Sequence, residues 1–329
     1  MSQRRACAAR ITVVGCFMQA ACWQVERLPR PGETLAATGF YTEPAGKGLA
    51  VAVGCRRLGA EVALLLSIGD DPAGDGLMQL LRREDLPTRH VRRRRAPSGH
   101  GSGWLSADGQ NAIAAYLGAN LLLDAAQVAQ ADAELARSAL VYAQFEAPPD
   151  AAREAFARAR RHGACTVLNP SPWQPPGAEL LAGTQVLLVN ALEAAQLLPH
   201  WPREPQPRQR AALAAMLEPL WRTWPGGAQR VLVVTLGPAG SLAFTPGGDS
   251  HYVPALAVKA RDSIGAGDAF AAGLCTALSQ GQALNQALRQ ANACGAFAVS
   301  HPGILAGLPT WAELQTLLAS QLSPAADHA

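Results

Sequence analysis

Residues 262–270, Asp-Ser-Ile-Gly-Ala-Gly-Asp-Ala-Phe, constrain the fold of this chain more than any other stretch. A glycine pair flanking an alanine precedes Asp268, and the apolar segment that follows predicts a helix. At its N-terminus the N–H groups of Gly265, Ala266 and Gly267 lack intrahelical acceptors. With the positive end of the helix dipole they form a seat for phosphate.

Asp268 is unusual beside such a seat, because a carboxylate repels the phosphate that the neighbouring N–H groups attract. It suits a base that deprotonates a hydroxyl as the hydroxyl attacks a phosphoryl group. In the alternative, Asp268 only stabilises the helix dipole from the first turn. The nonapeptide alone leaves both interpretations open.

Composition narrows the class of protein. A chain of 329 residues with 49% hydrophobic residues can form one large α/β domain with an appendage, or two domains. Its net charge of +3 is small and indicates neither a nucleic-acid nor a membrane partner. The sequence has no run of about 18 apolar residues, and its seven cysteines lack C-x-x-C spacing. We therefore expect a cytoplasmic protein with free thiols.

Short apolar runs alternate with amphipathic segments along most of the chain. Strands are expected at 11–15, 61–68, 140–145, 165–168, 185–189 and 230–234. Helices between them predict a doubly wound, mostly parallel α/β sheet covered on both faces. Ligands bind such sheets beyond the carboxyl ends of the strands.

Residues 17–45 and 88–118 have a different pattern, with short extended pieces separated by Pro and Gly. Asp108 and Gly109 form a dipeptide typical of β-hairpins. We expect these two segments to form a small β lid. The five arginines within 89–95 favour a solvated strand or loop over an anion-binding patch.

Two motifs follow expected strands directly. Asn190 and Glu193 could hold hydrated Mg²⁺ and phosphate oxygens, although alone they favour an ordinary capping box. Thr235, Gly237 and Gly240 could receive the phosphates or ribose of a nucleotide, and a plain turn between strands explains them equally well.

Gly46, Lys47 and Gly48 precede an expected helix, where the glycines would allow close approach and Lys47 would supply a cation. The Walker spacing is absent, so this is not a P-loop. No G-x-G-x-x-G follows the first strand, which disfavours a dinucleotide dehydrogenase. Clustered Cys and His residues typical of transition-metal sites are also lacking.

The order of these motifs resembles the ribokinase-like (PfkB) family of carbohydrate kinases from about residue 11 to 318, with the ribokinase branch most similar. The resemblance rests on residues 31–34, 46–48, 57–60, 68–71, 169–172, 190–193, 235–240 and 262–270. The joint occurrence of the motifs in order outweighs the separate alternatives.

The resemblance implies one ribokinase-like domain over residues 1–329, with the β lid above a sugar site. Asp268 would be the general base. Gly265, Ala266 and Gly267 would form the anion hole for the transferred phosphoryl group.

The resemblance also implies ATP and Mg²⁺. The residues expected at the nucleotide are Asn190, Glu193, Thr235, Gly237, Gly240 and Asn292. The residues expected at the substrate are Gly46, Lys47, Gly48, Glu146 and Asp262. A monovalent-cation (K⁺) site would be bordered by Asp262, Ile264, Ala298, His301 and Gly303. A homodimer through the lid is expected by the same resemblance.

Two positions depart from the ribokinase pattern. Ala20 stands where a sugar-binding Asp is expected, and Ala50 stands where an Asn is expected. Buried hydroxyls without partners cost roughly 1–3 kcal/mol each. We therefore expect ribose to be a poor substrate and a less polar or bulkier sugar to be preferred.

The sequence thus predicts an ATP-dependent kinase acting on a primary hydroxyl of a sugar or sugar-like molecule. A nucleoside kinase is the alternative enzyme. A sugar- or nucleotide-binding sensor without turnover is the alternative of another class.

Overall fold

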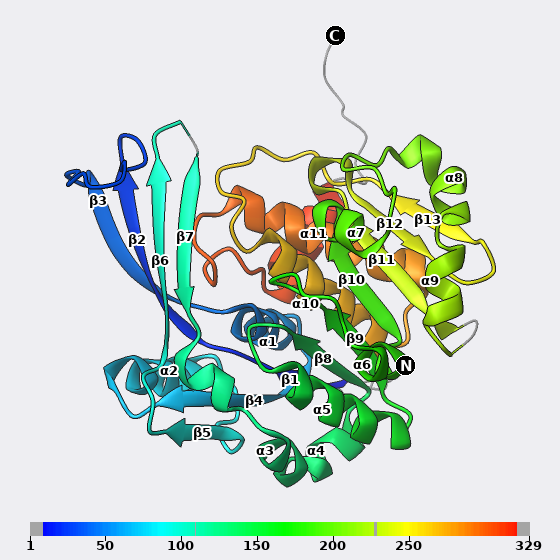
Figure 1. The fold of residues 1–329 in the computed structure, drawn as a ribbon, viewed down its shortest axis with the longest axis horizontal. Helices are drawn as coiled ribbons and strands as arrows, with labels where there is room; N and C mark the ends of the chain where they lie inside the picture. The colour runs from blue at the N-terminus through cyan, green and yellow to red at the C-terminus, as the bar shows by residue number, and fades with distance from the viewer. Residues whose placement is uncertain (1–8, 109, 227–228, 321–329) are drawn as a thin grey trace.

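A large sheet of nine strands forms the centre of the computed structural model, which describes residues 9–108, 110–226 and 229–320 (Figure 1). The sheet contains β1 (Arg10–Val14), β4 (Glu61–Gly69), β5 (Val91–Arg94), β8 (Leu140–Gln144), β9 (Cys165–Asn169), β10 (Val186–Asn190), β11 (Val231–Thr235), β12 (Ser241–Phe244) and β13 (Ser250–Val253). Their spatial order is β13-β12-β11-β10-β9-β8-β1-β4-β5. The strands from β11 to β5 pair in parallel, and β12 and β13 are antiparallel.

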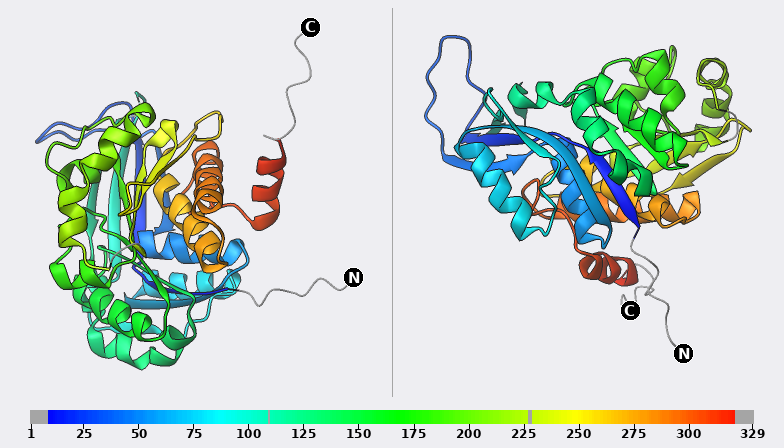
Figure 2. Two further views of the ribbon diagram at one scale, coloured as in Figure 1. Left: turned by 90° about the vertical axis from the view of Figure 1, so that its right-hand side faces the viewer. Right: turned by 90° about the horizontal axis from the view of Figure 1, so that it is seen from below.

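Helices cover both faces of this sheet, as the alternation predicts (Figure 2). One face packs against α1 (Lys47–Arg57), α2 (Pro72–Arg83), α10 (Ala266–Ser279) and α11 (Leu284–Ser300), with α12 (Trp311–Ser320) outside α11. The other packs against α3 (Ala125–Gln130), α4 (Asp132–Arg137), α5 (Pro149–Arg161), α6 (Ala178–Gly183), α7 (Ala191–Leu197), α8 (Arg210–Ala215) and α9 (Glu218–Thr223). Adjacent residues of each strand enter opposite cores: Val13 joins one and Val14 the other. The doubly wound α/β fold is confirmed.

Strand order reverses between β1 and β8. From β1 the chain builds outward through β4 and β5 on one side, and it then returns to place β8 against the other side of β1. In open α/β sheets this switch leaves a crevice at the carboxyl ends of the two strands, where ligands bind.

The smaller sheet has the order β3-β2-β6-β7 and stands beside the large one (Figure 1). It contains β2 (Met18–Val25), β3 (Gly39–Ala45), β6 (Gly99–Ser106) and β7 (Asn111–Tyr116). The neighbours pair antiparallel except for β2 and β6, which are parallel. We call this the lid sheet. The β6–β7 hairpin forms as expected, although Gly109 lies outside the described residues.

The prediction that all of residues 88–118 belong to the lid is partly wrong. Its first strand, β5, pairs in parallel with β4 and extends the large sheet. Two arginines of β5 pair with carboxylates: Arg93 with Asp70 at 3.1 Å and Arg94 with Asp124 at 3.6 Å. Local composition cannot tell which sheet an edge strand will join.

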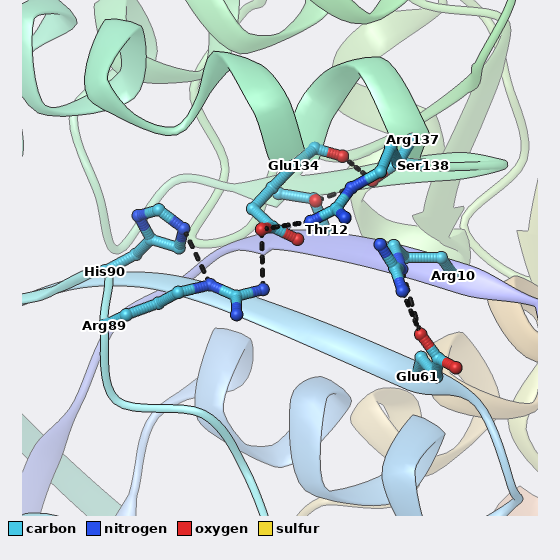
Figure 3. A network of polar contacts seen from close by, with 8 residues as sticks. All are labelled: Arg10, Thr12, Glu61, Arg89, His90, Glu134, Arg137 and Ser138. Atoms are coloured by element: carbon cyan, nitrogen blue, oxygen red, sulfur yellow. Dashed lines mark hydrogen bonds and ion pairs between the residues drawn. The ribbon is translucent and has the colours of Figure 1, made fainter.

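A polar network surrounds the start of β1, at the edge of the sheet opposite the crevice (Figure 3). Glu134 on α4 accepts from Arg89 at 2.6 Å and from Arg137 at 2.8 Å, while Arg10 pairs with Glu61. Three arginines of the run, Arg89, Arg93 and Arg94, therefore form ion pairs within the fold. Within the described ranges no helix is both long and apolar enough to span a bilayer.

Candidate active site

Three residues from separate elements meet at the switch point. Cys16 follows β1, Glu146 follows β8, and Lys47 begins α1. The Cys16 thiol donates to Glu146 Oε2 at 2.7 Å, and the Lys47 backbone N–H donates to the same oxygen at 2.8 Å. The Gly48 N–H donates to Cys16 Sγ at 3.3 Å. The Glu146 carboxylate is therefore fixed at the base of the crevice.

Burial governs the protonation of this group. Removal from water raises the pKa of Glu146, and the nearby Asp268 carboxylate adds to that rise. The Cys16 hydrogen bond and Lys47 act in the opposite direction. Burial, followed by the Glu146 charge, also raises the pKa of the Cys16 thiol well above its ordinary value. Cys16 is thus a neutral donor rather than a thiolate nucleophile.

The N-terminus of α10 lies at the same place. Gly265 has φ +79°, a left-handed conformation that suits glycine, and it ends the preceding loop. Asp268 sits in the first helical turn and is 9% exposed. No atom lies within 4 Å of the position that a Cβ on Gly267 would occupy, so this side of the turn is open. The Ala266 N–H makes a long turn contact to Ser263 O at 3.4 Å.

Lys47 is the cation of the cluster. Its Nζ lies 3.8 Å from Asp268 Oδ1. The Asp268 charge is the largest cause of the raised pKa of Lys47, with further contributions from Glu146 and Glu193. The structure thus brings together residues predicted at the substrate, at the base and at the nucleotide. They are Lys47, Glu146, Asp268 and Glu193. Such a site can hold an anionic group near Lys47 and receive a proton at Asp268.

Asn190 and Glu193 form a capping box at the start of α7. The Asn190 side chain accepts from Glu193 N at 2.8 Å, and Glu193 Oε2 accepts from Asn190 N at 2.9 Å. The ordinary interpretation of this motif is therefore realised in the structure. It leaves Glu193 Oε1 outside the box, an oxygen of the kind that suits a hydrated Mg²⁺, which usually keeps several waters. The residues fit Mg²⁺ through its water shell.

The expected nucleotide residues lie along one edge. Thr235 is the Cα partner of Asn190 across β10 and β11. The turn from Gly237 to Gly240 joins β11 to β12 and includes the 3₁₀ helix η4 (Gly237–Ala239). Asn292 on α11 donates to Val253 O at 2.9 Å and Pro254 O at 3.2 Å. The side chain of Asn292 thereby ties α11 to the end of β13.

The expected cation-binding residues form a group of backbone oxygens. The carbonyl oxygens of Ala298, His301 and Gly303 lie 3.3, 2.9 and 2.9 Å from the position of a Cβ on Gly307. Asp262 Oδ1 accepts from Ile264 N at 2.9 Å, and Asp262 N donates to Val299 O at 3.2 Å. Gly303 O and Ala298 O already accept backbone N–H groups, from Gly307 at 2.9 Å and from His301 at 3.1 Å, so the K⁺ site remains an expectation of the resemblance. The His301 ring stacks on Phe297, with ring centroids 4.0 Å apart.

The other positions discussed for the substrate differ in how closely they are packed. A Cβ on Gly48 would lie 2.4 Å from Gly15 Cα, and one on Gly46 would lie 2.8 Å from Cys16 O. Both glycines therefore allow α1 to approach β1. Ala50 is fully buried in the core, so it opens no space in a pocket; Ala20 on β2 is partly exposed.

No sequence motif marks Cys16 or Glu43. The Cys16 thiol donates to Glu146. Glu43 lies on β3. Its Oε2 accepts from Ile304 N at 3.0 Å, which joins the lid sheet to the loop after α11. The position of Glu43 depends on how distant strands pair, which no local motif reveals.

Comparison with known proteins agrees with the geometry. Residues 8–311 match the pfkB family carbohydrate kinases. The chain is 30% identical to a ribokinase of Mus musculus over 307 residues, covering 92% of each chain. It is 27% identical to a deoxyribokinase of Salmonella typhi over 302 residues, covering 91% of this chain and 95% of that one.

Among solved structures, Arabidopsis thaliana ribokinase complexed with ribose and ATP superimposes with a TM-score of 0.82 at 25% identity. The match covers 95% of this chain and 99% of that one. Together with the residues assembled at the switch point, these matches show that the chain belongs to the pfkB family of carbohydrate kinases, on its ribokinase-like branch.

Proposed function

We propose that the protein transfers the γ-phosphoryl group of ATP to a primary hydroxyl of a sugar or sugar-like molecule. One observation carries the proposal: Asp268 lies in the first turn of α10, 3.8 Å from the Lys47 ammonium and next to the open side of Gly267. A base, a cation and a helix N-terminus are the parts that phosphoryl transfer requires.

The roles of the residues follow from their chemistry. Asp268 accepts the proton of the hydroxyl as its oxygen forms a bond to the γ-phosphorus, and the bond from that phosphorus to the bridging oxygen breaks to release ADP. The N–H groups of Gly265, Ala266 and Gly267 face the charge that builds on the transferred group. Lys47 compensates negative charge beside the base.

The substrate enters between the crevice and the lid sheet. Glu146 presents a fixed acceptor at the end of β8, and Asp262 lies in the loop before α10. We assign them, with Gly46, Lys47 and Gly48, to the substrate side. The Arabidopsis ribokinase complex with ribose and ATP supports a sugar and a nucleotide as the two ligands.

The nucleotide side comprises Asn190, Glu193, Thr235, the Gly237–Gly240 turn and Asn292. Mg²⁺, held through water by Glu193, would neutralise the phosphates when bound. The carbonyl loop of Ala298, His301 and Gly303 would bind K⁺. Free thiols at the described cysteines are consistent with a cytoplasmic location.

The test is ADP release from the purified protein with ATP and Mg²⁺ over pentoses, hexoses, deoxy sugars, amino sugars and nucleosides. Sugar-dependent release supports the proposal. Release only with nucleosides identifies a nucleoside kinase, and binding without release identifies a sensor.

A further inference from the structure

The register of the lid sheet places Glu43 directly opposite Ala20. These two residues are Cα partners on the antiparallel strands β3 and β2. Directly opposite residues point to the same face of a sheet, with Cβ atoms about 4.5–5.5 Å apart. The ribokinase pattern has an Asp at position 20. In this chain a carboxylate is instead present on the neighbouring strand.

This face of the lid sheet is turned toward the body of the protein. Glu43 Oε2 accepts from Ile304 N at 3.0 Å, and a Cβ on Gly303 would lie 3.5 Å from the same oxygen. Within the described ranges Glu43 has no salt-bridge partner. Groups that donate hydrogen bonds are therefore suited to this position.

Small residues continue the row across the sheet. Ala20 pairs with Gly101 on β6, and Gly101 pairs with Ala115 on β7. The nearest atom to a Cβ on Gly101 would be 4.0 Å away. Glu43 thus stands at one end of a row of small residues that leaves room above β2, β6 and β7.

We infer that Glu43 is the lid carboxylate that binds hydroxyl groups of the sugar, and that it selects sugars whose hydroxyls reach β3 rather than β2. The inference rests on the proposed function and names a specificity-determining residue of that site. A substituent on the sugar would lie over the row of Ala20, Gly101 and Ala115. Hydrogen bonds to a charged acceptor change affinity by about tenfold to hundredfold.

Glu43→Gln separates this role from a purely structural one. The amide oxygen can still accept from Ile304 N, so the tie between lid and body is kept while the charge is lost. With the best substrate of the ADP-release screen, we expect KM for the sugar to rise about tenfold or more, with KM for ATP unchanged. Glu43→Ala should give a similar or larger rise.

A second experiment moves the carboxylate from β3 to β2. The double variant Ala20→Asp, Glu43→Ala should raise kcat/KM for ribose relative to the best substrate at least tenfold. Ala20→Asp alone should weaken binding of the best substrate, because two carboxylates then face each other across β2 and β3.

The outcomes distinguish the two levels of the proposal. Wild-type protein without sugar-dependent ADP release overturns the proposed function and, with it, the role of Glu43. An active wild type whose sugar KM stays within twofold in Glu43→Gln overturns the role of Glu43 alone. Circular dichroism of each variant confirms that the fold is retained.

Discussion

At the scale of single residues, Asp268 can be separated from a simple helix-dipole residue. As general base, its replacement by Asn should lower kcat by about 10²–10⁴-fold, with KM for ATP little changed. A dipole role alone would cost about 0.3–1 kcal/mol in the free energy of unfolding and leave turnover near the parental value. Steady-state kinetics and thermal melting of Asp268→Asn measure both quantities, and near-parental turnover would remove Asp268 from the mechanism.

Glu146 gives a prediction in which stability and activity move in opposite directions. Its pKa is raised in the folded protein, chiefly by burial, so ionisation is penalised there relative to the unfolded chain. The stabilising contribution is complete below the unfolded pKa and is lost as pH rises through the folded pKa.

Glu146→Gln removes that ionisation and keeps an oxygen for the Lys47 N–H. We therefore expect a higher Tm than wild type at pH 7, a difference that shrinks as pH falls toward 4, and a loss of sugar phosphorylation. Calorimetry from pH 4 to 8 checks the sign. A wild type that is more stable at pH 7 would show that Lys47 and Cys16 outweigh the burial of this carboxylate.

At the scale of elements, Asp71 shows how a motif of the family can serve the fold. It caps α2, accepting from Gly74 N at 2.8 Å, and its other oxygen accepts from Ser98 N at 2.7 Å. Burial acts against ionisation, but these hydrogen bonds and one from the Ser98 hydroxyl outweigh it and lower the pKa of Asp71. The carboxylate thus joins α2 to the start of β6.

Asp71→Ala should therefore lower the free energy of unfolding by about 1–2 kcal/mol. The pKa is depressed, so this stabilisation is complete above the unfolded pKa and is lost as pH falls through the folded pKa. Asp70→Ala is the matched control: Asp70 makes an exposed ion pair with Arg93 and should cost less than about 1 kcal/mol. Equal effects of the two substitutions in urea unfolding would contradict the assignment.

The strands and helices also show which features can be predicted from local sequence and which cannot. The alternation of strands and helices, the hairpin of β6 and β7 and the helix after residue 265 follow from local patterns. The placement of β5 in the large sheet and the pairing of Ala20 with Glu43 depend on register between distant segments. Asn190 and Glu193 show a further limit, because one local geometry serves both as a helix cap and as a proposed metal-facing pair.

At the scale of the whole molecule, the lid sheet exposes large apolar side chains. Glu43 marks the face turned toward the body. The alternating residues point the opposite way, and they include Phe40, Tyr116 and Trp23. Phe40 is 55% exposed and Tyr116 is 56% exposed, while the rings of Trp23 and Phe40 are in contact at 4.4 Å. Phe40 and Trp23 form a partly exposed aromatic patch on this face, and exposed apolar patches mark interaction surfaces.

We expect this outer face to meet the same face of a second copy in a symmetric homodimer, because a two-fold interface pairs identical patches. Phe40→Asp places a charge in that interface and should convert the dimer to a monomer. Leu192→Ser is the matched control, since Leu192 is 63% exposed but lies on α7, away from the lid sheet (Figure 1). Light scattering over a concentration series measures both variants. A wild type that is monomeric at every concentration, or a Phe40→Asp variant that stays dimeric, would show that the aromatic face has another role.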